Sequence, residues 1–128
     1  MSGRVRHWWP ALLWAAAVFF LSSRTVLIEM PSVLGWDKLQ HCAAYAVGGA
    51  AIAHALGAPA HRFAWAAALL GSLYGVSDEI HQYFVPGRSS DWRDWVADTV
   101  GVLAGVFLFR TYQTWRGRRN ERAPALER

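Results

Sequence analysis

Four apolar segments separated by short charged stretches most limit what this chain can fold into. They cover residues 8–21, 39–56, 63–84 and 92–112. A helix needs about 20 residues, within a range of roughly 17–25, to cross the hydrocarbon core of a bilayer. The last three segments meet this length, and the first meets it when His7 and Ser22–Ser23 are included. The pattern predicts an all-α, polytopic membrane protein with a bundle of four transmembrane helices.

Composition and charge agree with a membrane protein. Of the 128 residues, 54% are hydrophobic and 17% are charged, which excludes a disordered chain. Cys42 is the only cysteine, so no intrachain disulfide can form. The net charge of +4 comes from basic residues that flank the apolar segments, as they do around membrane helices. We therefore expect the lipid bilayer, and not a nucleic acid, as a partner.

Turn and cap residues predict where the helices begin and end. Asp37 followed by Gln40 predicts a capping box at the start of the second helix, and residues 57–59 (Gly-Ala-Pro) predict its end. Residues 85–90 predict a turn, with Ser90 or Asp91 as the next N-cap. We predict helices over about 7–23, 38–57, 62–84 and 91–113, forming a transmembrane domain of residues 1–115 that precedes a basic cytoplasmic tail, 116–128.

The basic residues predict which side of the membrane each end faces. With four spans, nine basic residues share the side of both termini: Arg4, Arg6, Arg62, Arg110, Arg116, Arg118, Arg119, Arg122 and Arg128. The other side carries four, namely Arg24, Lys38, Arg88 and Arg93. Because cytoplasmic loops are enriched in Lys and Arg, both termini are expected in the cytoplasm.

Polar residues recur at helical spacing toward the outer ends of the last three helices. Residues 37, 41 and 45 (Asp, His, Tyr) share one face of the second helix, and residues 91, 94 and 98 (all Asp) share one face of the fourth. Asp78 and Gln82 share a face of the third helix, with Glu79 beside them. The pairs Gly71/Gly75 and Gly101/Gly105 allow close helix packing below this level. We predict an outward-facing polar cleft.

Ionisable side chains within membrane helices are costly and are by default candidates for a functional site. The predicted ligand-binding residues are Asp37, Lys38, His41, Tyr45, Asp78, Glu79, Gln82, Arg88, Asp91, Asp94 and Asp98. The candidates for a catalytic role are Asp78, Glu79, His41 and Asp94. The structural alternative is a buried ion-pair network in which Lys38, Arg88 and Arg93 neutralise the carboxylates and set the register of the helices.

More than half of the chain resembles a known family. The matching motifs are DKLQHCAAY at 37–45 and GVSDEIHQYFVPGRSSDWRD at 75–94, followed by Asp98 and Gly101. These resemble the VanZ-like family of small bacterial membrane proteins, named after a protein linked to teicoplanin resistance. The family favours Asn where this chain has Asp98, which adds one possible charge. The resemblance implies a multi-pass protein of the bacterial cytoplasmic (inner) membrane with an outward-facing polar motif.

Three classes of function fit these features. The first is a protein that binds an envelope precursor or a glycopeptide-type ligand and contributes to teicoplanin-type resistance or envelope maintenance. The second is an intramembrane enzyme for a lipid-linked envelope substrate, using a divalent metal or acid–base chemistry of the Asp, Glu and His residues. No H-E-x-x-H or G-x-S-x-G motif is present to support it. The third, a small proton-coupled carrier, needs an acidic residue near mid-membrane, and residues 11–20 contain none.

Overall fold

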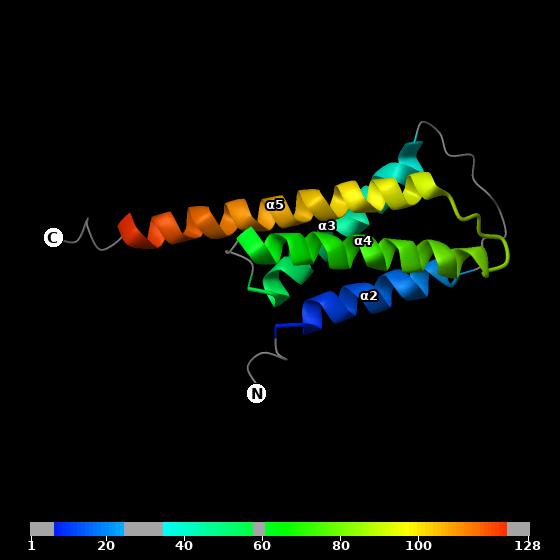
Figure 1. The fold of residues 1–128 in the computed structure, drawn as a ribbon, viewed down its shortest axis with the longest axis horizontal. Coiled ribbons are helices and arrows are strands. Elements are labelled where there is room, and N and C mark those ends of the chain that lie inside the picture. The colour runs from blue at the N-terminus through cyan, green and yellow to red at the C-terminus, as the bar shows by residue number, and fades with distance from the viewer. Residues whose placement is uncertain (1–6, 25–34, 58–60, 123–128) are drawn as a thin grey trace.

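The computed structural model describes residues 7–24, 35–57 and 61–122, and these form four helices (Figure 1). The helices are α2 (Trp9–Ser22), α3 (Trp36–Ala55), α4 (His61–Tyr83) and α5 (Trp92–Arg122). The prediction of an all-α fold with four helices is therefore confirmed for this part of the chain.

The predicted helix limits are close to the observed ones except at the end of α5. That helix was expected to end at residue 113 and instead continues to Arg122, so the first part of the predicted basic tail is helical. Residues 114–122 contain no proline and are rich in arginine, which favours a helix, and the one glycine among them, Gly117, does not end it. All other helix ends lie within two residues of their predicted positions.

The predicted capping box at Asp37 is wrong. Helix α3 begins two residues earlier than predicted, at Trp36 after Gly35, whose φ of +73° is the left-handed conformation that glycine adopts most readily. No side chain caps this helix; the Asp37 carboxylate pairs with Lys38 instead. The prediction of Asp91 as an N-cap is confirmed, because its Oδ1 accepts a hydrogen bond from the Arg93 N–H (2.9 Å) at the start of α5.

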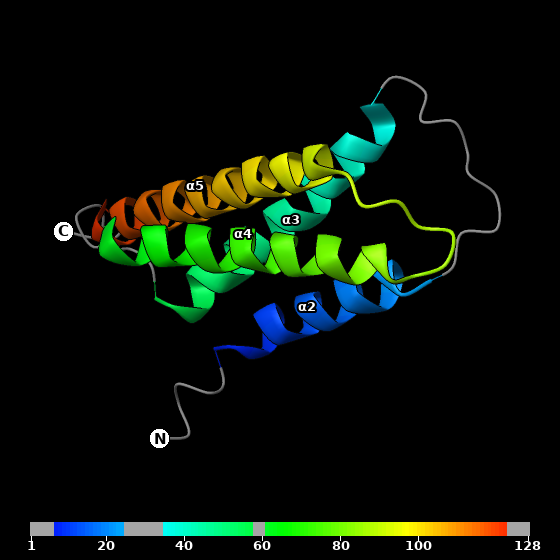
Figure 2. The same ribbon diagram turned by 45° about the vertical axis from the view of Figure 1, so that its right-hand side comes forward.

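The helices pack side by side as a bundle in which α3 and α5 run in one direction and α2 and α4 run in the other (Figures 1 and 2). The most extensive contact is between α3 and α5; α4 packs on both of them, and α2 packs on α3 and α4. The first residues of α3 and α5 and the last residues of α4 and α2 therefore meet at the same end of the bundle.

Glycines bring α3 and α5 into backbone contact. A Cβ atom on Gly101 would overlap the carbonyl oxygen of Cys42, and one on Gly105 would overlap that of Ala46. In the other direction, a Cβ on Gly49 of α3 would overlap the backbone of Val102. The close approach predicted for Gly101 and Gly105 is confirmed. A Cβ atom on Gly71 of α4 would lie only 2.6 Å from the Val102 side chain, so α4 also packs closely on α5.

The core beside this contact is aromatic. Trp14 of α2 meets Tyr45 edge-on with ring centroids 5.3 Å apart, and its ring lies 5.0 Å from that of Tyr74. The Trp14 indole N–H donates to the Ala44 carbonyl (2.8 Å), and the Tyr74 hydroxyl donates to the Ala15 carbonyl (2.6 Å). These hydrogen bonds satisfy the polar atoms of large rings inside the bundle and attach α2 to α3 and α4.

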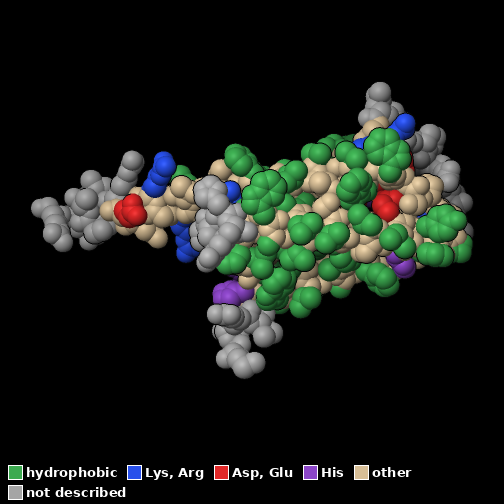
Figure 3. Space-filling view, in the orientation of Figure 1, with side chains coloured by type: hydrophobic (Ala, Val, Ile, Leu, Met, Phe, Trp, Pro, Cys, Tyr) green, Lys and Arg blue, Asp and Glu red, His purple; other side chains and the backbone are tan. Residues whose placement is uncertain are grey.

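None of the described helices combines the length and the mean hydropathy needed to cross a membrane. The face of the bundle in Figure 3 is nevertheless largely covered by apolar side chains, drawn in green. Exposed apolar residues occur on every helix, and they include Leu12, Leu13, Phe20, Leu39, Val47, Trp65, Leu69, Leu73, Ile80, Val100, Phe107 and Leu108.

The glycine contacts predict which small substitutions the fold does not accept. Gly101→Ala and Gly105→Ala should each lower the free energy of unfolding by about 1–3 kcal/mol, because the added methyl group pushes α5 away from α3. Gly117→Ala is the matched control in the same helix, since nothing lies within 4 Å of its Cβ position. It should be neutral or stabilise by up to about 1 kcal/mol. Thermal unfolding of the purified variants measures the difference; equal effects at Gly105 and Gly117 would contradict the packing.

Candidate functional site

Polar side chains of α3, α4 and α5 meet inside the end of the bundle where α3 and α5 begin. We call this set the polar cluster; it consists of Lys38, His41, Tyr45, Asp78, Glu79, Gln82, Asp91, Asp94 and Asp98. Several members are deeply buried, since the exposed fraction is 5% for Asp78, 7% for Glu79 and 0% for Asp98. Burying ionisable groups costs free energy unless they are paired or bind a ligand.

Lys38 neutralises the outermost carboxylates. Its ammonium group pairs with Asp37 (3.0 Å) and Asp91 (3.3 Å) and makes a short contact with Asp94. Lys38 thus ties the start of α3 to the start of α5, as the structural alternative expects, and its charge is shared among three acceptors.

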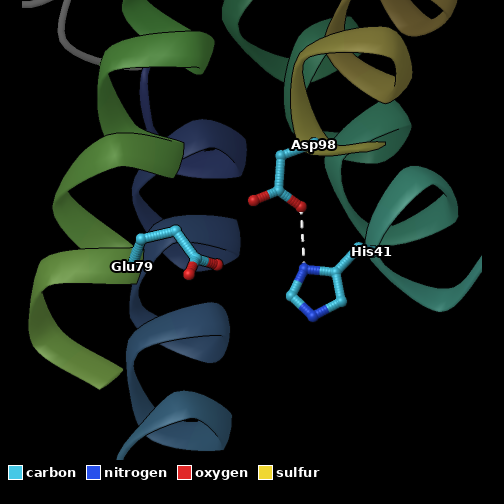
Figure 4. A group of neighbouring side chains, drawn as sticks. All are labelled: His41, Glu79 and Asp98. Carbon is cyan, nitrogen blue, oxygen red and sulfur yellow. Dashed lines mark hydrogen bonds and ion pairs between the residues drawn. The ribbon is translucent and has the colours of Figure 1, made fainter. Parts of the chain in front are cut away.

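His41, Glu79 and Asp98 lie deeper, and their side chains point toward one another from three helices (Figure 4). Nδ1 of His41 and Oδ1 of Asp98 are 2.9 Å apart and hydrogen-bonded. On the other side, Oε2 of Glu79 accepts hydrogen bonds from the Ser90 hydroxyl (3.0 Å) and from the Asp91 N–H (2.9 Å). One nitrogen of His41 and one oxygen from each carboxylate all lie within 4.8 Å of one another, a spacing from which a metal ion could be held.

Asp78 belongs to a separate hydrogen-bonded group. Its Oδ2 accepts from the Tyr45 hydroxyl (3.3 Å) and from the Gln82 amide (3.0 Å). The same Gln82 amide group also donates to the hydroxyl of Ser22 (3.4 Å), at the end of α2. This group is built from α2, α3 and α4, whereas the Lys38 pairs join α3 to the start of α5.

The two arginines of the structural alternative do not pair with these carboxylates. Arg88 donates to the backbone carbonyls of Leu21 (2.8 Å) and Arg24 (3.3 Å), which attaches the α4–α5 loop to α2. The guanidinium of Arg93 lies over the Trp92 ring, 5.9 Å from its centroid. Within residues 7–24, 35–57 and 61–122, Lys38 and His41 are the basic residues that pair with the acidic side chains of the cluster.

The predicted site residues line two cavities rather than one. The smaller cavity, of about 190 Å³, is lined by His41, Tyr45, Asp78, Gln82 and Arg88 together with residues of α2. The larger, of about 430 Å³, has Glu79 and Ser90 beside the apolar side chains of Val76, Ile80, Tyr83, Phe84, Trp92 and Trp95. Asp98 lines neither, and Asp37, Lys38, Asp91 and Asp94 form the paired group at the helix ends.

Two serines in contact with the cluster were not among the predicted site residues. Ser90 was considered only as a helix cap, yet its hydroxyl donates to Glu79. Ser22 was considered only as a helix end, yet it is buried against Gln82. Helical spacing identifies residues that share a face of one helix, so it gives no signal for a loop or terminal residue that reaches a neighbouring helix.

The model of the VanZ/LLP1 family matches residues 7–113 of the chain. The match includes the whole polar cluster and the glycine contacts between α3 and α5. No curated protein and no solved structure shows significant similarity to the chain.

The Lys38 pairs predict a pH-dependent loss of stability in the variant Lys38→Met. Without the ammonium group, three carboxylates face one another, and the melting temperature at pH 7 should fall by roughly 2–5 °C. The ion pairs exist only while the carboxylates are ionised, so they stabilise the folded protein at neutral pH and lose this effect as the pH falls and the carboxylates are protonated. The difference between wild type and variant should therefore shrink as the pH falls below the usual carboxyl pKa of 3.8.

Arg119→Met is the control for this measurement. Arg119 lies over the Trp115 ring near the end of α5 and belongs to no carboxylate pair in the described segments. Its melting temperature should follow that of the wild type at every pH. A deficit for Lys38→Met that does not change with pH would contradict the assigned role of the pairs.

Proposed function

Because the chain belongs to the VanZ/LLP1 family, we propose that it is an integral membrane protein of the bacterial cell envelope that contributes to glycopeptide (teicoplanin-type) resistance or to envelope maintenance. In this proposal the four helices span the cytoplasmic membrane, and the polar cluster engages an envelope precursor from the outer side. The family supports a link to resistance; the membrane, the side and the ligand are our inferences.

The distribution of polar and apolar side chains supports a lipid environment. Four acidic residues of the cluster, Asp78, Glu79, Asp94 and Asp98, are buried, whereas large apolar side chains such as Phe20, Leu69 and Phe107 are exposed. A water-soluble bundle usually has the opposite arrangement. Mean hydropathy averages over the inward and outward sides of a helix, so buried carboxylates and glycines lower it without lying against lipid. Helix α3, with 20 residues, is roughly 30 Å long, the thickness of the hydrocarbon core.

The directions of the helices suit an arrangement in which the polar cluster lies at the outer side. The start of α2 and the end of α5 are at the bundle end opposite the cluster (Figure 1). That end carries the basic residues Arg110, Arg116, Arg118 and Arg119. The positive-inside rule would place it in the cytoplasm, and the cluster would then face the exterior.

Reporter fusions test this orientation. Fusions after Arg119 and within residues 57–61 should report the cytoplasm, because the ends of α3 and α5 and the start of α4 lie at the basic end of the bundle. Fusions near Glu29, which lies outside the described residues, and near Gly87 should report the exterior. A paired reporter that is active only in the cytoplasm and another that is active only outside provide the measurement. An exterior C-terminal fusion would overturn the orientation.

The ligand proposal depends on the position of Glu79. It stands between the His41–Asp98 pair and a cavity whose other walls are mainly apolar and aromatic. A lipid-linked precursor has an apolar chain and a head group rich in hydroxyl and amide donors. The chain suits the apolar walls, and the head group can donate hydrogen bonds to the carboxylates. Separate titrations of the purified protein with a lipid-linked precursor and with a glycopeptide show which of the two ligands binds.

A second candidate function is an intramembrane enzyme for the same class of substrate. The observation that favours it is the His41–Asp98 hydrogen bond beside Glu79. A carboxylate that holds one nitrogen of a histidine orients the ring for proton transfer, and Glu79 would be a second acid or base. Conversion of the lipid-linked precursor to a new product by the purified protein would favour this candidate over binding alone.

Glu79→Gln and Asp78→Asn test whether the cluster has a function beyond packing. Each change removes a charge and keeps the size and an acceptor oxygen, so the variants should fold and insert normally. They should lose the resistance conferred by the wild type, and variants at Gln82 and Arg88 should behave likewise. Melting temperature in detergent and the glycopeptide concentration that inhibits growth are measured for each variant.

Glu121→Gln is the control for these variants, because Glu121 is exposed near the end of α5 and far along the helix from the cluster. It should retain full resistance. A Glu79→Gln protein that is destabilised by several kcal/mol, as loss of one partner of a buried pair would cause, would indicate a structural role. A stable variant with full resistance would also reject the site.

A further inference from the structure

We propose that His41, Glu79 and Asp98 form a binding site for one divalent transition-metal ion, with zinc as the ion that fits the donors best. A resident ion would belong to the polar cluster described above. The inference rests on the proposed function only in taking this cluster to be the functional site. Binding of the ion can be measured without any envelope ligand.

The geometry brings three donors from separate helices to one point. His41 is on α3, Glu79 on α4 and Asp98 on α5, and the three side chains converge (Figure 4). Their donor atoms lie within 4.8 Å of one another. Ligand atoms around tetrahedral zinc are about 3.4 Å apart, as bonds of roughly 2.1 Å require. A bound ion would draw the three donors from their present spacing to this separation.

Unpartnered oxygens at this point indicate that something binds there. Three buried side-chain oxygens have no hydrogen-bond partner in the described segments, namely Asp37 Oδ1, Glu79 Oε1 and Asp98 Oδ2. Two of them belong to the proposed site, on residues that are 7% and 0% exposed. A buried carboxylate oxygen without a donor costs free energy. A cation between Glu79 and Asp98 would satisfy both oxygens at once.

The other oxygen of each carboxylate is already held in place. Oε2 of Glu79 accepts from Ser90 and from the Asp91 N–H, and Oδ1 of Asp98 is bonded to His41. Hydrogen bonds such as those to Glu79, from groups outside the ligand set, fix the orientation of metal ligands and are a regular feature of such sites. The His41–Asp98 hydrogen bond joins two of the ligands, so its proton would be released to solvent when the ring nitrogen binds the ion. Oε1 of Glu79 and Oδ2 of Asp98 are the oxygens without a partner that would contact the ion.

The charges of the cluster also favour a cation. The ammonium of Lys38 is engaged by Asp37, Asp91 and Asp94. Arg88 donates to backbone carbonyls. Glu79 therefore has no ion pair in the described residues, and Asp98 has only the imidazole of His41. A divalent ion would neutralise both carboxylates and present a positive charge to a ligand in the neighbouring cavity.

The donor set selects the class of metal. One imidazole and two carboxylates resemble the three-ligand sites in which zinc keeps an open position for water or substrate. Calcium takes six to eight oxygen ligands, and magnesium keeps several waters, so both suit this compact and buried set less well. None of the three proposed ligands is a cysteine, so the site does not include the thiol of Cys42, the residue after His41.

Isothermal titration with zinc alone tests the inference on the full chain in detergent, after removal of metals by a chelator and of any affinity tag. The wild type should bind one zinc ion per chain. Glu79→Gln, Asp98→Asn and His41→Gln should each weaken binding by at least about tenfold. Glu121→Gln and His81→Gln are matched controls and should bind as the wild type does, because His81 instead stacks on Phe19 and hydrogen-bonds to Ser23.

X-ray absorption of the zinc-loaded protein gives a second readout. It should show only nitrogen and oxygen ligands at about 2.0–2.1 Å; a sulfur ligand at about 2.3 Å would place the ion on Cys42 and overturn the site. Circular dichroism shows whether each variant is folded. Because three ligand variants are measured, the test remains valid if one of them does not fold. No zinc binding by the wild type, or unchanged affinity in the folded ligand variants, would overturn the inference.

The outcomes also separate this inference from the proposed function. If Glu79→Gln binds zinc as the wild type does but loses resistance, the metal site is rejected and the function of the cluster is supported. If it loses zinc and keeps full resistance, the metal site is supported and the proposed function is rejected.

Discussion

The backbone contact between α3 and α5 is the constraint on which the rest of the structure depends. Gly101 and Gly105 present no side chain to α3, so the carbonyls of Cys42 and Ala46 lie directly against α5. This contact sets the register of two parallel helices. Since His41 precedes Cys42 and Asp98 lies one turn before Gly101, the same register brings His41 to Asp98 and allows their hydrogen bond. A shift of α5 by one turn would separate Lys38 from Asp94 and His41 from Asp98.

The buried charges are arranged around this contact in layers. Lys38 joins the carboxylates at the helix ends, and His41 and Asp98 come next along the two helices. The glycines follow below, where the helices are too close to admit polar side chains. Helix α4 completes the arrangement by bringing Glu79 to the His41–Asp98 pair and Asp78 to Tyr45. The closely packed part of the bundle around the glycines thus supports the polar cluster, whose donors come from three helices. Bundles position ligands and metal ions in this way.

Glu79 connects the buried pair with the surface. One oxygen is fixed by Ser90 and the Asp91 N–H of the loop before α5, while the other has no partner in the described residues. The side chain also lines the larger cavity. A ligand in that cavity would therefore meet the same carboxylate that approaches His41 and Asp98. In our proposals this single residue couples the recognition of an envelope ligand to the binding of a cation.

Local features of the chain were enough to predict four helices and most of their limits, because apolar segments, caps and helix breakers act over a few residues. Helical spacing was also enough to place Asp94 and Asp98, or His41 and Tyr45, on one side of a helix, and to identify Gly101 and Gly105 as points of close packing. The choice of partner for each charge depended on the tertiary structure. Lys38 pairs with three aspartates, Arg88 donates to backbone carbonyls at the end of α2, and Ser90 donates to Glu79. Spacing along one helix says which residues share a face, but the neighbours of that face are set by the register between helices, and packing of distant segments decides that register.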